Sequence, residues 1–283
     1  MKNIYLLPLL LLLLFYTPFE ASADDQKLII GTTPWDSPEN LQKMFAPLME
    51  HLSKTLEKKT VFRVSRTYEE LSLRIQDQTI DIGFFSPLSY VETKKKIPSL
   101  KYILTLLKKD ETGTVRDHYK GVIISLYTSP FNSLLDLKGK KFAFTSYQST
   151  SGYLYPNALL KTRGIVPASY FSEVFMLKKH ENIIAALIHH SIDAGATWDE
   201  SLTSAIRRHG NIFKVLAETN PIPLDAYAAG PHVSDQLCDA IRKALLLIKS
   251  DSPLLRKMQN LGFPFDGFSL RNDEFYNVVR EIQ

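Results

Sequence analysis

The chain has 283 residues, a net charge of +4 from 34 basic and 30 acidic side chains, and one cysteine, Cys238. A chain of this length with 45% apolar residues can bury a core without disulfides, and a single cysteine excludes a disulfide framework. The charges are interspersed and the net charge is small, which excludes a long basic tract for nucleic acid, so we expect no nucleic-acid partner.

The N-terminus has the pattern of a secretory signal. Lys2 precedes an almost unbroken apolar run over residues 4–15, and the small residues Ala21, Ser22 and Ala23 follow before Asp24. We therefore predict a signal peptide at residues 1–23, cleaved near Ala23, and a protein secreted across the inner membrane into the periplasm. The run is short for a spanning helix, and an uncleaved anchor is the alternative.

Strand-like and helix-like segments alternate after the signal. This alternation predicts α/β layers with largely parallel sheets, arranged as two domains. In the first part, the pattern predicts strands at 27–33, 61–65 and 80–85, and helices at 38–58 and 68–76. We expect Pro47 to kink the first of these helices.

The middle of the chain repeats the scheme. It predicts strands at 121–127, 141–145, 173–177 and 193–197, a helix after Ser151 and a helix at 180–189. The proline-rich segment ETNPIPLD, which ends at Asp225, predicts a return to the first domain. We therefore assign residues 24–118 plus 225–283 to domain 1 and residues 119–224 to domain 2.

The segment FAFTSYQSTSGYLYPNALLKTRG, residues 142–164, predicts a strand that runs into hydroxyl residues where a helix begins. The first amides of a helix have no partner within it and lie at the positive end of its dipole. Ser149, Thr150 and Ser151 would add hydroxyl donors to these amides, which suits an oxyanion without a fixed cation. The same residues also suit an ordinary helix cap, and both interpretations stay open.

Other polar residues give weaker signals. His180 opens a predicted helix, where it could donate to an oxyanion or solvate the helix terminus. Tyr68 and Tyr119 lie near element ends, where a tyrosine often packs its ring and solvates its hydroxyl. His189 and His190 are adjacent and lack a carboxylate or cysteine at ligand spacing, so we expect no metal site and no cofactor.

Six segments carry a resemblance to a known family: LIIGTTPWDSPENL, TIDIGFFSPLSYV, YKGVIISLYTSPFNSLLDLKGKKFAF, QSTSGYLYPNALLKTRGI, KKHENIIAALIHHSIDAGATWDESL and SPLLRKMQNLGF. Through them nearly the whole mature chain resembles the phosphate, phosphite and phosphonate binding proteins of bacterial ABC importers. The resemblance implies a type II-like periplasmic binding protein, with two α/β domains joined by a double-crossover hinge. It also implies a monomer that delivers a small phosphorus oxyanion to an ABC permease in the inner membrane.

The resemblance further implies ligand contacts from both domains. The implied residues are Ser149, Thr150, Ser151, His180, Tyr68, Tyr119, Ser86, Asp199, Glu200 and Asp225. The three consecutive hydroxyls and nearby amides would hold the phosphoryl oxygens, and His180 would approach from the next strand-to-helix junction. Tyr68, Tyr119 and Ser86 would close the opposite side. The acidic residues, with Asp199 or Glu200 in the same role, would meet the substituent on phosphorus or a protonated oxygen.

Two other functions remain as alternatives. The protein could present the same class of anion to a membrane sensor instead of a permease, and nothing in the sequence separates these roles. A secreted hydrolase could use Ser149 or Ser151 with His180 and Asp199 as a triad. The sequence has no GxSxG motif, and several adjacent hydroxyls suit an anion binder better than a single nucleophile, so we expect no enzymatic activity.

Overall fold

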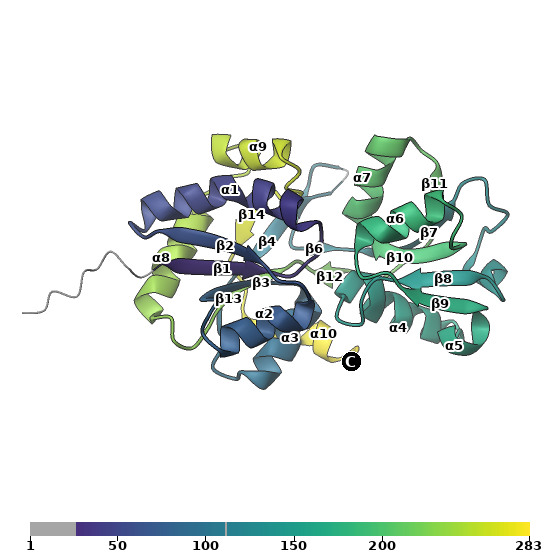
Figure 1. The fold of residues 1–283 in the computed structure, drawn as a ribbon, viewed down its shortest axis with the longest axis horizontal. Coiled ribbons are helices and arrows are strands. Elements are labelled where there is room, and N and C mark those ends of the chain that lie inside the picture. The colour runs from purple at the N-terminus through teal and green to yellow at the C-terminus, as the bar shows by residue number, and fades with distance from the viewer. Residues whose placement is uncertain (1–26, 111) are drawn as a thin grey trace, which may run out of the picture.

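The computed structural model describes residues 27–110 and 112–283, which form two lobes side by side (Figure 1). Each lobe is a β-sheet with helices on its faces, as the alternating pattern predicts. The predicted signal peptide lies outside the described residues. Within the described residues, no helix combines the length and apolar character needed to span a membrane.

Lobe 1, on the left of Figure 1, contains a seven-stranded sheet in the order β14-β4-β13-β3-β1-β2, with β5 paired to β4. Its strands are β1 (Leu28–Thr32), β2 (Thr60–Val64), β3 (Ile82–Phe85), β4 (Lys101–Lys109), β5 (Val115–Arg116), β13 (Ala226–Ala229) and β14 (Gly267–Ser269). β1, β2 and β3 are parallel, whereas β13, β4 and β14 add antiparallel pairs. Our expectation of a largely parallel sheet therefore holds for only part of this lobe.

The helices of lobe 1 cover both faces of this sheet, with α1 and α9 on one side and α2 and α3 on the other. They are α1 (Pro38–Thr55), α2 (Tyr68–Gln76), α3 (Pro87–Lys96), α8 (Asp235–Leu246), α9 (Pro253–Asn260) and α10 (Asn277–Arg280), with a 3₁₀ turn, η3, at Asp273–Tyr276. The α1 helix is continuous through Pro47. Its apolar face packs on the sheet, where the Phe45 ring stacks on Phe62 at 4.5 Å.

Lobe 2 contains a five-stranded sheet in the order β11-β7-β10-β8-β9. Its elements are β7 (Gly121–Leu126), η1 (Leu134–Leu137), β8 (Lys141–Phe144), η2 (Thr150–Leu154), α4 (Tyr155–Thr162), α5 (Pro167–Tyr170), β9 (Glu173–Met176), α6 (His180–Ile188), β10 (Ala194–Trp198), α7 (Asp199–His209) and β11 (Phe213–Glu218). β8 is parallel to β9 and β10, and β7 is antiparallel to both of its neighbours. Separate apolar clusters fill the two sides of this sheet.

Two short strands connect the lobes. β6 (His118–Tyr119) leads into lobe 2, β12 (Ile222–Pro223) leads back, and the two pair with each other as an antiparallel ribbon. The chain therefore crosses twice between two α/β lobes, which is the fold class that the sequence predicts. The boundaries at residues 118/119 and 224/225 stay a prediction.

Candidate functional site

The segment after β8 forms an unusual helix start. Ser149 is the N-cap, and its Oγ accepts a hydrogen bond from the amide of Gly152 at 3.0 Å. The first turn, η2, is π-helical, and α4 continues from it. A Cβ atom at residue 152 would lie 1.9 Å from the Oγ1 of Thr145, so glycine is required for this close approach. Ser149 is therefore a helix cap, while the neighbouring hydroxyls face other elements.

The Thr150 hydroxyl faces the start of α3 in lobe 1. The backbone amide of Leu88 donates to Thr150 Oγ1 at 2.9 Å, which joins the two lobes directly. Ser86 is the N-cap of α3, but its side chain makes no capping bond. The buried Ser86 Oγ has no hydrogen-bond partner among the described residues. Because a buried hydroxyl usually has a partner, Ser86 is a candidate donor to a bound ligand.

Two tyrosines lie beside the serines of this segment. Tyr68, at the start of α2, lies near Ser149, and Tyr119, in the ribbon, lies near Ser151, and all four line the same cavity. Burial raises the pKa of both phenols above the usual value. Both hydroxyls therefore keep their protons and remain possible donors.

His180 is the first residue of α6, and its side chain is buried. Its Nδ1 lies 2.9 Å from the hydroxyl oxygen of Thr197. Burial lowers the pKa of the imidazole to about 3, so the ring is neutral at physiological pH. When Thr197 donates to Nδ1, the other ring nitrogen carries the proton and supplies a neutral donor.

Asp225 follows the ribbon strand β12. Its carboxyl lies among buried side chains, and burial raises the pKa to about 8. Within the described part of the chain, no hydrogen-bond donor contacts this carboxyl, and no cation offsets its desolvation. At neutral pH the group is therefore mostly protonated, and a protonated carboxyl can donate a hydrogen bond to an anion.

These side chains meet in one small cavity between the lobes, with a volume of about 30 Å³. Its lining is Trp35, Tyr68, Ser86, Tyr119, Ser149, Thr150, Ser151, His180, Trp198, Leu224, Asp225 and Phe265. Eight of the ten predicted site residues are in this set. A cavity of this size accommodates few heavy atoms. Its lining contains no lysine or arginine, so an anion would be held by neutral donors and helix N-termini.

On the aromatic side of the cavity, the sequence reasoning named neither Trp35 nor Phe265. The rings of Trp35, Trp198 and Phe265 lie within 6.1–6.3 Å of one another, and they come from both lobes. Trp35 follows the end of β1, just as Ser86 follows the end of β3. This shared position after a strand could have indicated Trp35 from the sequence. Phe265 lies in an irregular segment that has no such signal. The cavity thus has one hydroxyl-rich side and one aromatic side.

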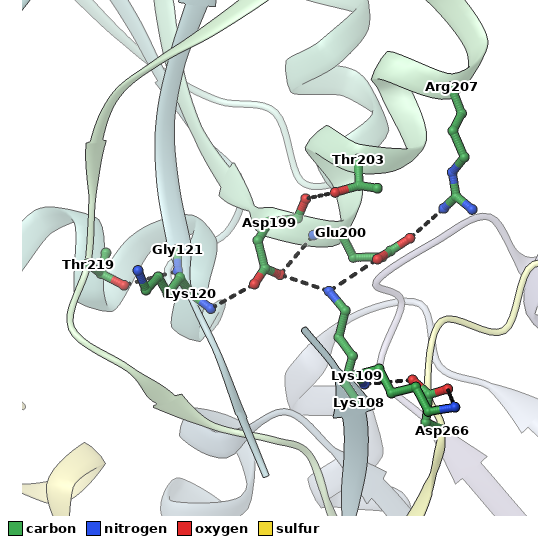
Figure 2. Close-up of polar contacts among 10 residues, drawn as sticks. All are labelled: Lys108, Lys109, Lys120, Gly121, Asp199, Glu200, Thr203, Arg207, Thr219 and Asp266. Atoms are coloured by element: carbon green, nitrogen blue, oxygen red, sulfur yellow. Dashed lines mark hydrogen bonds and ion pairs between the residues drawn. The ribbon is translucent and has the colours of Figure 1, made fainter. Parts of the chain in front are cut away.

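Asp199 and Glu200 do not line this cavity. Both lie in the first turn of α7 and form ion pairs with Lys108 of lobe 1, at 3.3 Å and 3.1 Å (Figure 2). Glu200 also pairs with Arg207 of its own helix. The start of α7 thus brings both carboxylates to Lys108 of β4. Glu200 also lines a larger hollow that shares Trp35, His180 and Trp198 with the cavity, and the contact of either residue with the ligand stays a prediction.

The alternative catalytic triad is not assembled either. The Asp199 carboxylate accepts from the amide of Lys120 at 3.2 Å and pairs with Lys108, while the described partner of His180 is Thr197. A histidine whose pKa lies near 3 is a weak general base. Ser149, His180 and Asp199 therefore do not form the relay that hydrolysis would need.

Two α/β lobes, a two-stranded hinge and a small cavity between the lobes define a solute-binding protein of the periplasmic type. The chain belongs to the family of ABC transporter phosphonate periplasmic substrate-binding proteins, whose sequence model matches residues 30–276. It is therefore a substrate-binding component of a transporter family, with a small-molecule ligand and a membrane permease as its partners.

Individual relatives are distant in sequence. The chain is 24% identical to the phosphate-import protein PhnD of Mycolicibacterium smegmatis, across 75% of this chain and 70% of that one. It is 25% identical to the probable ABC transporter phosphite binding protein PhnD1 of Prochlorococcus marinus, across 65% and 64%. The solved structure of PhnD1 in complex with methylphosphonate superposes with a TM-score of 0.80 at 20% identity, covering 90% of this chain and 96% of that one. This likeness supports the fold.

Proposed function

We propose that the protein binds a small phosphorus oxyanion, namely a phosphonate, phosphite or phosphate, in the cavity between its lobes and delivers it to an ABC permease. The observation that carries this proposal is the cavity itself, a small space lined by neutral hydrogen-bond donors from both lobes and by no cationic side chain. The methylphosphonate complex of the similarly folded PhnD1 supports the same class of ligand.

The hydroxyl-rich side would bind the oxyanion. Ser86, Thr150 and Ser151 would donate to its oxygens together with the amides at the start of η2. Hydrogen bonds to a charged acceptor contribute more than those between neutral groups, so a few suffice. The protonated Asp225 carboxyl would add a further donor, whereas its ionised form would repel the anion.

The aromatic side would meet the remaining substituent on phosphorus. Trp35, Trp198 and Phe265 suit hydrogen or methyl, because neither requires a polar partner. An aminoalkyl group would need more space and a carboxylate, but Asp199 and Glu200 are engaged by Lys108. Among the ligands that the sequence left open, we therefore favour phosphite and methylphosphonate over aminoalkyl phosphonates.

Closure of the lobes would complete the site. The cavity lining comes from both lobes, so a ligand that contacts both stabilises the closed arrangement. The ribbon of β6 and β12 is the place where the chain would bend. We further propose that the mature protein is a monomer in the periplasm, released by cleavage near Ala23. Presentation of the ligand to a sensor remains the alternative use of the same site.

A thermal-shift screen tests the ligand class. Phosphate, phosphite, methylphosphonate, 2-aminoethylphosphonate and sulfate would each be added to the purified mature protein. A ligand at 100 times its dissociation constant stabilises the fold by about 2.7 kcal/mol, which corresponds to roughly 5–10 °C for a chain of this size. We expect such a shift with at least one of the first three anions. No shift with any phosphorus compound, or an equal shift with sulfate, would contradict the proposal.

A further inference from the structure

Lys108 makes a set of contacts between the lobes outside the ligand cavity. It lies near the end of β4 in lobe 1, and its Nζ is 3.3 Å from Asp199 Oδ1 and 3.1 Å from Glu200 Oε2 of lobe 2 (Figure 2). The same Nζ lies 5.5 Å from the centroid of the Trp198 ring, which lines the cavity. One lysine of lobe 1 thus contacts three consecutive residues of lobe 2.

The ion pair between Lys108 and Glu200 is shielded from solvent, whereas the Asp199 side chain is 36% exposed. The side chains of Lys108 and Glu200 are each 14% exposed, so their attraction is screened less than that of a surface ion pair. If the pair is separated while either side chain stays buried, the unpaired charge has lost its ion pair and is not fully hydrated in exchange, which costs free energy. The contacts of Lys108 with lobe 2 can therefore influence the relative position of the two lobes.

The acceptors of the network are held within lobe 2. Glu200 pairs with Arg207, which lies about two turns farther along α7. Asp199 accepts a hydrogen bond from the backbone amide of Lys120, next to the ribbon. Lys108 alone among these residues comes from lobe 1 (Figure 2). Rotation of the lobes about the ribbon would therefore separate Lys108 from its partners and leave the pairs within lobe 2 in place.

We propose that Lys108 is a positioning residue that favours the closed arrangement before any ligand binds, and that it thereby sets the affinity of the cavity. The effect on affinity rests on the proposed function, whereas the effect on closure does not. The apparent dissociation constant equals the intrinsic one divided by the fraction of binding-competent protein. Loss of Lys108 lowers that fraction, so it weakens all ligands by one common factor.

The test compares Lys108→Met with Lys109→Met. Lys109 is the next residue of β4, and its Nζ is 3.9 Å from Asp266 within lobe 1, so its loss removes a neighbouring charge without removing a contact between lobes. Small-angle X-ray scattering of the ligand-free proteins measures closure, and calorimetry with phosphite, methylphosphonate and phosphate measures affinity. Lys108→Arg tests rescue by a conservative change.

We expect a larger radius of gyration for ligand-free Lys108→Met and unchanged values for Lys109→Met and Lys108→Arg. For every ligand that the wild type binds, Lys108→Met should raise the dissociation constant by roughly three- to tenfold, with the ratios between ligands preserved. If the wild type binds none of the anions, the proposed function fails and scattering still decides the question of closure.

Unchanged scattering in Lys108→Met would overturn the inference. So would a loss of affinity that differs among ligands, because that pattern indicates a direct effect on the cavity. Should Lys108→Met fail to fold, Glu200→Gln removes part of the same contact from lobe 2. That variant should also expand the ligand-free protein, and an unchanged radius of gyration would count against the inference equally.

Discussion

Asp225→Asn should remove a pH dependence from ligand binding. The pKa of the half-buried Asp225 carboxyl is about 8, so the protonated fraction falls from about nine-tenths at pH 7 to about one-tenth at pH 9. If only the protonated carboxyl favours the anion, wild-type affinity should fall up to about tenfold between these pH values, which is about 1.4 kcal/mol. An asparagine amide donates at either pH, so the variant should lack this decrease.

Calorimetric titrations of both proteins at pH 6, 7, 8 and 9 would measure the effect. The ratio of the two dissociation constants cancels the ionisation of the ligand and of other groups shared by the proteins. We expect this ratio to be nearly constant up to pH 7 and to change progressively above it. A ratio that stays constant from pH 6 to pH 9 would refute the role assigned to Asp225.

The same substitution has a consequence for stability without ligand. The folded-state pKa of about 8 lies above the ordinary value of 3.8, so the folded protein binds more protons than the unfolded chain between these values. The contribution of Asp225 therefore lowers the free energy of unfolding as pH rises from about 4 to 8. Asp225→Asn should remove that loss and be more stable than the wild type at pH 8 by at least about 1 kcal/mol in urea denaturation.

Four further substitutions probe the site. Thr150→Ala and Ser151→Ala should each weaken binding by about 1–3 kcal/mol in calorimetry, and unchanged affinity in both would leave the segment only a capping role. Ser151→Ala should have little effect on folding, whereas Thr150→Ala also removes the acceptor of the Leu88 amide and should lower stability. Ser86→Ala should also weaken binding, but its free energy of unfolding in urea should change by less than about 0.5 kcal/mol, because Ser86 Oγ has no partner among the described residues. His180→Gln should make the free energy of unfolding less sensitive to acid. The pKa of His180 is about 3 in the folded protein against 6.5 in the unfolded chain, so His180 costs up to about 2 kcal/mol of stability between pH 7 and pH 5. An equal loss of stability in the variant would argue against a buried neutral ring.

The sequence predicted the elements that run from a strand into a hydroxyl-bearing turn. Ser149, Thr150 and Ser151 were found because an apolar strand runs into them where a helix begins. The resemblance added Ser86, Tyr68, Tyr119 and Asp225, which the local pattern marks weakly. All of these line the cavity, although their contact with a ligand stays a prediction.

The remaining features depend on distant contacts. Asp199 and Glu200 directly follow a strand like the other site residues, but their direction is set by Lys108, which lies 91 positions from Asp199. Our sequence reading contained no element between residues 85 and 121, so α3, β4 and its lysine were missed. The π-helical turn at Thr150 likewise depends on close packing between Gly152 and Thr145. The spacing of apolar residues in the sequence does not indicate this contact.

A crystal structure of the mature protein grown with methylphosphonate tests the central claim most directly. The account predicts closed lobes with the phosphorus atom in the cavity, its oxygens within hydrogen-bonding distance of Ser86, Thr150 and Ser151, and its methyl group against Trp35 and Trp198. Methylphosphonate bound elsewhere, or in the cavity with its oxygens turned toward the aromatic side, would contradict the account.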